Sequence, residues 1–176
     1  PIESIYLGED GLIPPEVKFH HDPNSTHGFC GAALSSNVIH WWKNDLGKWC
    51  WEKIIDVENE PHPEWPIPIP GVMSAILVSM DDKYLYLNNW LHGDMRQYDI
   101  SDPHKPKLTG QVWIGGLLGK APKVNGVRMA GGPQMFQLSL DGRRLYVTTS
   151  LFSTWDNQFY PEIRKKGGVM VMIDCD

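Results

Sequence analysis

One phrase occurs twice in the chain, sixty residues apart, and restricts the fold more than any other feature. Residues 79–87 read SMDDKYLYL and residues 139–147 read SLDGRRLYV. Each copy places an Asp-Asp or Asp-Gly turn between two apolar segments, and these residues tolerate the backbone conformations of a tight turn. The endings also match, because YDISD closes one unit at residues 98–102 and MIDCD closes the other at residues 172–176. A repeat of this length with several strands is typical of propeller blades.

Short segments rich in β-branched and aromatic residues alternate with 17 Gly and 14 Pro along the chain. Almost no segment has the three-and-four spacing of an amphipathic helix, so the pattern predicts an all-β fold. One short helix is expected near residues 156–165, with Pro161 in its first turn. A strand-like run also covers residues 16–19. We expect strands at residues 4–7, 38–42, 49–57, 75–78, 84–88, 97–100, 109–114, 136–140, 145–149 and 169–173.

The two copies define two units, and residues 31–57 fit a third, more degenerate one. We therefore expect about three β-propeller blades, at roughly residues 17–60, 61–118 and 127–176. Three blades cannot close a ring, because propellers usually have four to eight. The last strand, at residues 169–176, also lacks a closing element. We therefore expect residues 1–176 to form part of a propeller whose other blades belong to a longer protein.

Composition excludes some partners. The formal net charge is −5 and no basic stripe is present, so nucleic-acid binding is not expected. The longest apolar run, residues 71–80, is too short for a transmembrane segment. Cys30, Cys50 and Cys175 form an odd, sparse set without a CxxC pair, which favours a reducing, cytoplasmic location.

The candidate chemistry lies among seven histidines. His62 and His104 flank prolines in polar stretches and are expected to be solvated. His40 lies in a predicted strand beside Trp41 and Trp42, which favours a cross-strand aromatic pair. The full set is His20, His21, His27, His40, His62, His92 and His104.

His21 and His92 are the candidates for a metal. His20 and His21 are adjacent at the end of a strand-like run, so at most one of them faces a given site. His92 follows a predicted strand, and Gly93 beside it permits close approach of a ligand. No HxH or HExxH spacing is present, so a metal site needs ligands from several blades.

Two other features have alternative interpretations. Residues 131–133 (GGP) lack a phosphate-loop pattern and predict a tight entry into the innermost strand of a blade. Cys30 lies near His27 and His21 and is either a reactive thiol or a buried structural cysteine, of which the second is commoner. No catalytic Ser-His-Asp or Cys-His set can be assigned.

Four stretches resemble the selenium-binding protein family, also called methanethiol oxidases. They are NWLHGDMRQYDISDP at residues 89–103, AGGPQM at 130–135 with QLSLDG at 137–142, SLFSTWDNQFYP at 150–161, and HDP at 21–23 with GF at 28–29. They follow the family's order from about residue 17 to residue 173.

The resemblance implies a seven-bladed propeller and oxidation of methanethiol by O2 and water to formaldehyde, hydrogen sulfide and hydrogen peroxide, with copper as cofactor. Selenium binding and a role in intra-Golgi protein transport are also linked to the family. His92 matches the histidine of its Trp-Leu-His-Gly-Asp motif, and His21 that of its His-[Asn/Asp]-Pro motif. Imidazole suits copper, and a soft thiolate suits copper(I).

The chain departs from the family pattern in three places. The family's selenium-associated cysteine motif and its His-Glu-x-Arg-Tyr-Pro-Gly-Gly motif are absent, and residues 117–127 are shorter than the loop of many relatives. We therefore expect these residues alone to be inactive.

Two function classes stay open for the complete protein. One is a copper-dependent methanethiol oxidase with His21 and His92 as ligands. The other is a non-catalytic propeller that binds selenium, a metal or protein partners, with a role in protein transport or as a scaffold. A nuclear or peripheral membrane location is an alternative to a cytoplasmic one.

Overall fold

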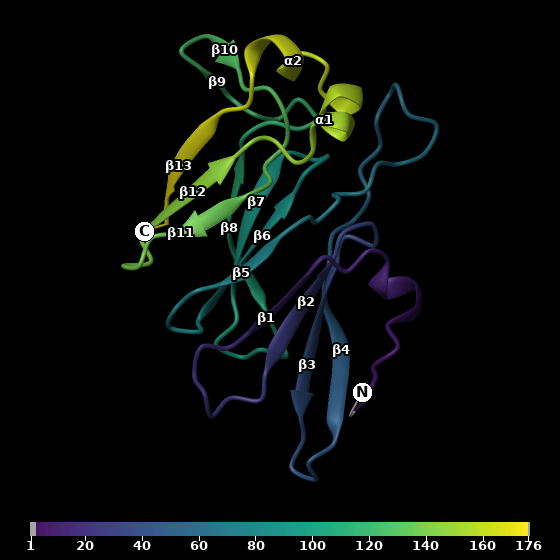
Figure 1. Cartoon of the computed structure of the whole chain (residues 1–176), viewed down its shortest axis with the longest axis vertical. Coiled ribbons are helices and arrows are strands. Elements are labelled where there is room, and N and C mark those ends of the chain that lie inside the picture. The colour runs from purple at the N-terminus through teal and green to yellow at the C-terminus, as the bar shows by residue number, and fades with distance from the viewer. Residues whose placement is uncertain (1–2, 176) are drawn as a thin grey trace.

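The computed structural model describes residues 3–175, so Pro1, Ile2 and Asp176, which ends the last predicted unit, lie outside the described residues. Three larger antiparallel sheets, of three or four strands each, follow one another along the long axis of the molecule (Figure 1). Two short helices cover one end of the third sheet. The all-β prediction is confirmed at this level. No helix among residues 3–175 has the length and apolar character needed to cross a membrane.

Sheet 1 and sheet 2 are four-stranded meanders, in which each strand pairs with the next one along the chain. Sheet 1 consists of β1 (Glu16–Phe19), β2 (Gly28–Ala32), β3 (Asn37–Lys43) and β4 (Trp49–Asp56). Sheet 2 consists of β5 (Ile76–Val78), β6 (Tyr84–Asn89), β7 (Asp94–Asp99) and β8 (Lys107–Trp113).

Sheet 3 has three strands in the described residues and is accompanied by the smaller elements. It consists of β11 (Phe136–Leu138), β12 (Arg144–Thr148) and β13 (Met170–Asp174). The other elements are the 3-10 helix η1 (Gly8–Gly11), the hairpin β9 (Lys123–Val124) and β10 (Val127–Arg128), and the helices α1 (Ser153–Phe159) and α2 (Ile163–Lys166).

The repeated phrase forms the same turn in sheets 2 and 3. In sheet 2 the hydroxyl of Ser79 donates to Asp81 at 2.6 Å and accepts from the backbone N–H of Tyr84 at 2.9 Å. Ser139 makes the corresponding bonds to Asp141 and Arg144, at 2.5 and 3.0 Å. The phrase recurs because its Ser and Asp side chains replace backbone partners at the turn.

Apolar side chains from neighbouring sheets fill the space between them. Phe29 and Val38 of sheet 1 pack with Leu85 and Leu87 of sheet 2 in one buried cluster. Tyr86 and Met95 of sheet 2 pack with residues of sheet 3 in a second cluster, whose buried members from sheet 3 are Leu138, Leu145 and Val147. The sheets are therefore held to each other by continuous apolar contact rather than by backbone pairing.

Glycines allow the backbone to pack closely where sheets 2 and 3 meet. A Cβ at Gly131 would collide with the carbonyl of Thr149, and one at Gly132 with that of Trp90. The prediction of a tight entry into β11 for residues 131–133 is therefore consistent with the packing. Cys30 is 7% exposed, and burial raises the pKa of its thiol, which favours the structural alternative.

Two predicted elements are wrong. Residues 4–7 form no strand, because they are mostly exposed and pair with no other segment before η1 begins at Gly8. The single helix near residues 156–165 is two helices, α1 and α2, because the chain leaves helical geometry at Tyr160, immediately before Pro161. Strand β2 was not predicted, since its five residues are all buried and show no alternation.

Candidate functional site

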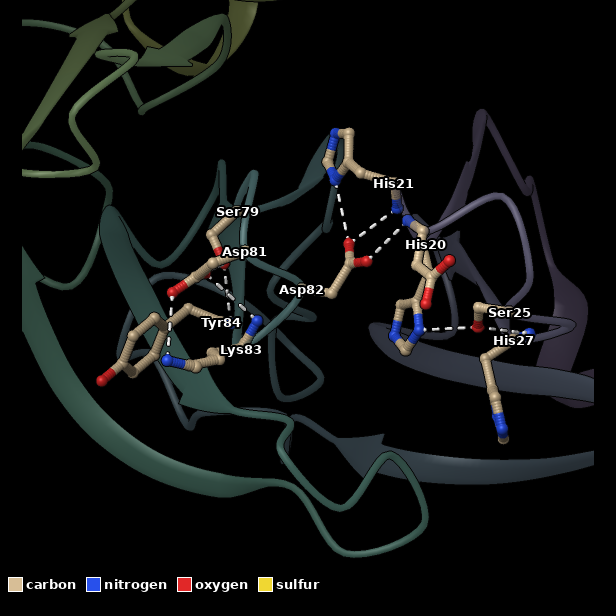
Figure 2. Close-up of polar contacts among 10 residues, drawn as sticks. His20, His21, Ser25, His27, Ser79, Asp81, Asp82, Lys83 and Tyr84 are labelled. Carbon is tan, nitrogen blue, oxygen red and sulfur yellow. Dashed lines mark hydrogen bonds and ion pairs between the residues drawn. The ribbon is translucent and has the colours of Figure 1, made fainter.

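His21 lies at a junction between sheets 1 and 2. Asp82, in the turn between β5 and β6, accepts two hydrogen bonds at Oδ1 from His21, at 2.7 Å from the backbone N–H and 2.9 Å from Nδ1. Its Oδ2 accepts a third from the N–H of Asp22 at 2.9 Å. Figure 2 shows the bonds between Asp82 and His21. Because a carboxylate only accepts, His21 carries its proton on Nδ1, and Nε2 presents a lone pair.

The charge of Asp82 is stabilised by these contacts. Burial opposes ionisation, but the N–H groups of His21 and Asp22 outweigh it, so the pKa of the Asp82 carboxyl lies below its usual value. A carboxylate that holds one nitrogen of an exposed histidine while the other nitrogen is open matches the outer-shell arrangement of histidine metal ligands. His21 therefore fits a metal ligand chemically.

A small cavity of about 190 Å³ lies beside His21. Its walls come from the first strands of all three sheets, β1, β5 and β11, and from the residues that follow them. The lining is mainly apolar and includes Lys18, His21, Leu77, Met80 and Leu138.

His92 lies in the connection between β6 and β7 and is fully buried. Its Nε2–H donates to the carbonyl of Ile69 at 2.9 Å, which ties residues 60–70 to sheet 2. Burial lowers the pKa of His92, so the ring is neutral at pH 7. Its Nδ1 is buried and has no hydrogen-bond partner among residues 3–175.

The structure does not bring His21 and His92 together. His21 contacts the turn that precedes β6, whereas His92 lies beyond the other end of that strand. Six residues of extended chain separate these ends by about 20 Å. Each residue therefore remains a separate prediction as a metal ligand.

Three other histidines do converge. One ring nitrogen each from His27, His40 and His104 lies within 4.8 Å of the others, and within residues 3–175 no further group of three or more His, Cys, Asp or Glu side chains has such spacing. Sequence reasoning missed this histidine cluster. It assigned His104 to the solvent and His40 to an aromatic pair, and His40 does pair across strands with Phe29.

Comparison with known proteins places the chain in a family. The family model for the 56 kDa selenium-binding protein (SBP56) matches residues 1–176. Methanethiol oxidase from Rattus norvegicus is 51% identical over 96% of this chain and 39% of its own length. Selenium-binding protein 3 from Arabidopsis thaliana is 51% identical over 97% of this chain and 39% of its own length.

A solved structure supports the same assignment. The structure of a hypothetical selenium-binding protein from Sulfolobus tokodaii superimposes with a TM-score of 0.87 at 42% identity, and the match covers 98% of this chain and 40% of that one. The chain thus spans about two fifths of the length of these relatives. On these matches in sequence and fold, the chain belongs to the 56 kDa selenium-binding protein family.

Proposed function

We propose that the complete protein containing this chain is a copper-dependent methanethiol oxidase. It converts methanethiol, O2 and water to formaldehyde, hydrogen sulfide and hydrogen peroxide. The observation that carries the proposal is the identity of 51% and 49% to methanethiol oxidases of Rattus norvegicus and Homo sapiens, each over 96% of the chain. Because the chain spans 39% of those proteins, the activity is assigned to the complete protein.

We further propose that the three sheets are consecutive blades of a seven-bladed propeller, at about residues 17–60, 61–118 and 127–176. The meander order of sheets 1 and 2 and the recurrence of the capped turn support this arrangement. In such a ring the first strands β1, β5 and β11 would line the central channel. The cavity beside His21 would then open onto that channel, where remaining blades could add ligands.

His21 is the residue of this chain that best fits a copper ligand. Asp82 fixes its tautomer and orientation, which leaves Nε2 for the metal. Bound copper would supply thiolate binding and one-electron exchange with O2. His92, the second predicted ligand, would need its buried Nδ1 and further ligands from outside the described residues.

The cavity suits a small thiol. Leu77, Met80 and Leu138 offer an apolar wall for a methyl group. Lys18 lines the same cavity, and its positive charge favours the ionised thiolate over the neutral thiol. This chain would thus bind the methyl group, orient His21 and stabilise the charge of the substrate sulfur.

The test uses the complete protein, with copper content and release of hydrogen sulfide from methanethiol as readouts. His21→Ala should lower both at least 100-fold, and Asp82→Asn should lower copper affinity about 10- to 100-fold. His62→Ala is the matched control, since its ring only accepts a local N–H of Glu64. Unchanged copper content and turnover in His21→Ala would contradict the assignment.

The alternative function is a non-catalytic protein that binds selenium or a metal. It is favoured by the names of two relatives, selenium-binding protein 2 of Mus musculus and selenium-binding protein 3 of Arabidopsis thaliana, at 50% and 51% identity. Retained metal or selenium without production of hydrogen sulfide by the wild-type protein would support this alternative. A role in protein transport and a cytoplasmic location stay predictions.

A further inference from the structure

The histidine cluster joins two sheets. His27 immediately precedes β2, His40 lies in the middle of β3, and His104 lies in the loop between β7 and β8 of sheet 2. Sheet 1 therefore supplies two rings and sheet 2 supplies the third. The ring centroids of His27 and His40 are 5.0 Å apart, and those of His40 and His104 are 4.7 Å apart.

Glu52 of β4 organises two of the rings. Its Oε1 accepts from Nδ1 of His104 at 2.5 Å and from Nδ1 of His40 at 3.3 Å. A carboxylate accepts from both, so both rings carry their protons on Nδ1 and present Nε2 as a lone pair. This is how an outer-shell carboxylate orients histidine ligands around a metal.

The third ring already shares a proton with the second. Nδ1 of His27 lies 2.8 Å from Nε2 of His40. Because Glu52 fixes the lone pair on Nε2 of His40, His27 donates this hydrogen bond from Nδ1. For a metal ion to replace this proton, His27 must shift to the neutral tautomer protonated at Nε2, so that its Nδ1 and Nε2 of His40 both offer lone pairs, with Nε2 of His104 as the third.

The rings of the cluster differ in their exposure to solvent. The His40 side chain is fully buried and that of His104 is 40% exposed. Trp42 stacks on His40 and meets His104 edge-on, which forms an apolar wall beside the rings. The cluster is thus anchored at one end and open to solvent at the other, which gives an ion a path of entry.

The spacing is close to that of a bound ion. Tetrahedral coordination with bonds of about 2.0–2.1 Å places ligand nitrogens about 3.4 Å apart. The nitrogens here lie up to 4.8 Å apart, so the widest pair must close by about 1.4 Å, and the His27–His40 pair at 2.8 Å must open by about 0.6 Å. His104 can move, because it lies on an exposed loop, and His27 can move, because it lies just outside β2.

We propose that His27, His40 and His104 form a binding site for a late first-row divalent cation, Zn²⁺ or Cu²⁺, with Glu52 as the outer-shell acceptor. Three neutral imidazoles are the ligands that both ions accept. The bound ion leaves its fourth position toward solvent and links sheet 1 to sheet 2. The site shares no residue with the proposed copper site at His21, so it does not depend on the proposed oxidase activity.

The test is calorimetric titration of the complete, chelator-stripped protein with Zn²⁺ and, separately, with Cu²⁺. His104→Ala should remove one equivalent of at least one ion, and Glu52→Gln should weaken that equivalent about 10- to 100-fold. His21→Ala should retain it, which separates this site from the proposed copper ligand. His62→Ala is the control for loss of a surface histidine.

A spectroscopic readout identifies the ligands. In the Cu²⁺ titration, the His21→Ala protein should retain one equivalent of copper, whose electron paramagnetic resonance spectrum shows coupling to imidazole nitrogens. This signal should disappear when His27→Ala or His104→Ala is added to His21→Ala. Equal stoichiometry in wild type and His104→Ala for both ions would overturn the proposal and leave the cluster as a hydrogen-bonded network.

Discussion

His92 and the histidine cluster differ in nearly every physical respect. His92 lies in a recognisable motif, yet its ring is sealed from solvent and one nitrogen holds the carbonyl of Ile69. The cluster of His27, His40 and His104 belongs to no motif, yet its nitrogens converge beside a carboxylate and one ring is open to solvent. A motif can therefore mark a place where the backbone must pack closely, while ligand geometry arises elsewhere.

Close packing restricts which residues the loop around His92 can contain. Gly93 has a φ of +97°, and a Cβ there would collide with the carbonyl of Gly115. A Cβ at Gly116 would meet the carbonyl of His92. The buried carboxylate of Asp94 accepts from the side chains of Asn89, Arg96 and Gln111. The loop is therefore constrained by its own neighbours before any ligand is considered.

The largest effect should come from Gly93→Ala. The added methyl group requires both a left-handed backbone and displacement of the Gly115 carbonyl, so we expect a loss of about 3 kcal/mol or more in the free energy of unfolding. Urea denaturation of the complete protein measures it. Gly142→Ala is the matched control, because Gly142 has a φ of +75° and open space, and should cost about 1 kcal/mol. Equal losses in the two variants would show that the loop is not tightly packed.

His92→Ala and His104→Ala test the comparison directly. His92→Ala leaves a buried cavity and removes one of two hydrogen bonds to the Ile69 carbonyl, which keeps the N–H of Glu60, so it should cost about 2–3 kcal/mol in unfolding free energy. His104→Ala, assayed without metal, should cost less than about 0.5 kcal/mol but remove one metal equivalent. Thermal denaturation and metal analysis give both readouts. Loss of a metal equivalent in His92→Ala would instead support His92 as a ligand.

The bound ion should stabilise the fold through the same cluster. An ion that binds only the folded state at 100 times its dissociation constant adds about 2.7 kcal/mol to the unfolding free energy. Zn²⁺ should therefore raise the melting temperature of wild type and of His62→Ala, but not that of His104→Ala. A similar rise in all three proteins would place the ion at another site.

The smallest effect is expected in the turn at Ser139 and Asp141, where the side chains hydrogen-bond each other and the backbone. Hydrogen bonds from Ser139 and from the backbone of Arg143 lower the pKa of Asp141 to about 2. Because the pKa of Asp141 is lower in the folded protein than in the unfolded chain, the ionised carboxylate stabilises the fold above pH 3.8, its ordinary pKa. This stabilisation is lost as the pH falls toward 2. Carboxyl NMR titration should show a midpoint near 2 in wild type and a rise toward 3.8 in Ser139→Ala. An unchanged midpoint would remove Ser139 as the cause.

The sequence predicts the regular parts of the fold because their signals are local. The polar turns after Ser79 and Ser139, and the β-branched segments around them, identify most strands of sheets 2 and 3. The first segment, residues 4–7, has the same composition but finds no partner strand, which composition alone does not reveal. Strand β2 escapes prediction because it is buried on both faces.

The candidate sites depend on contacts that are remote in sequence. His21 was identified by its motif, but its partner Asp82 lies 61 residues away in the turn of another sheet. The cluster combines His27, His40 and His104 across two sheets, and its outer-shell Glu52 is 52 residues from His104. No local spacing rule detects such a set, since packing of sheet 1 against sheet 2 creates it. To predict this cluster from the sequence, one would have to predict which strands and loops of the two sheets lie next to each other.

The most direct test of the central claim is anomalous X-ray scattering from crystals of the complete protein soaked in Zn²⁺ and, separately, in Cu²⁺, with data on both sides of the absorption edge of each metal. We predict a peak about 2.0–2.1 Å from one nitrogen each of His27, His40 and His104, with Glu52 still bonded to Nδ1 of His40 and His104. The same crystals should show His92 unchanged against Ile69. No peak between the three rings in either soak, with the His27–His40 hydrogen bond intact, would contradict the account.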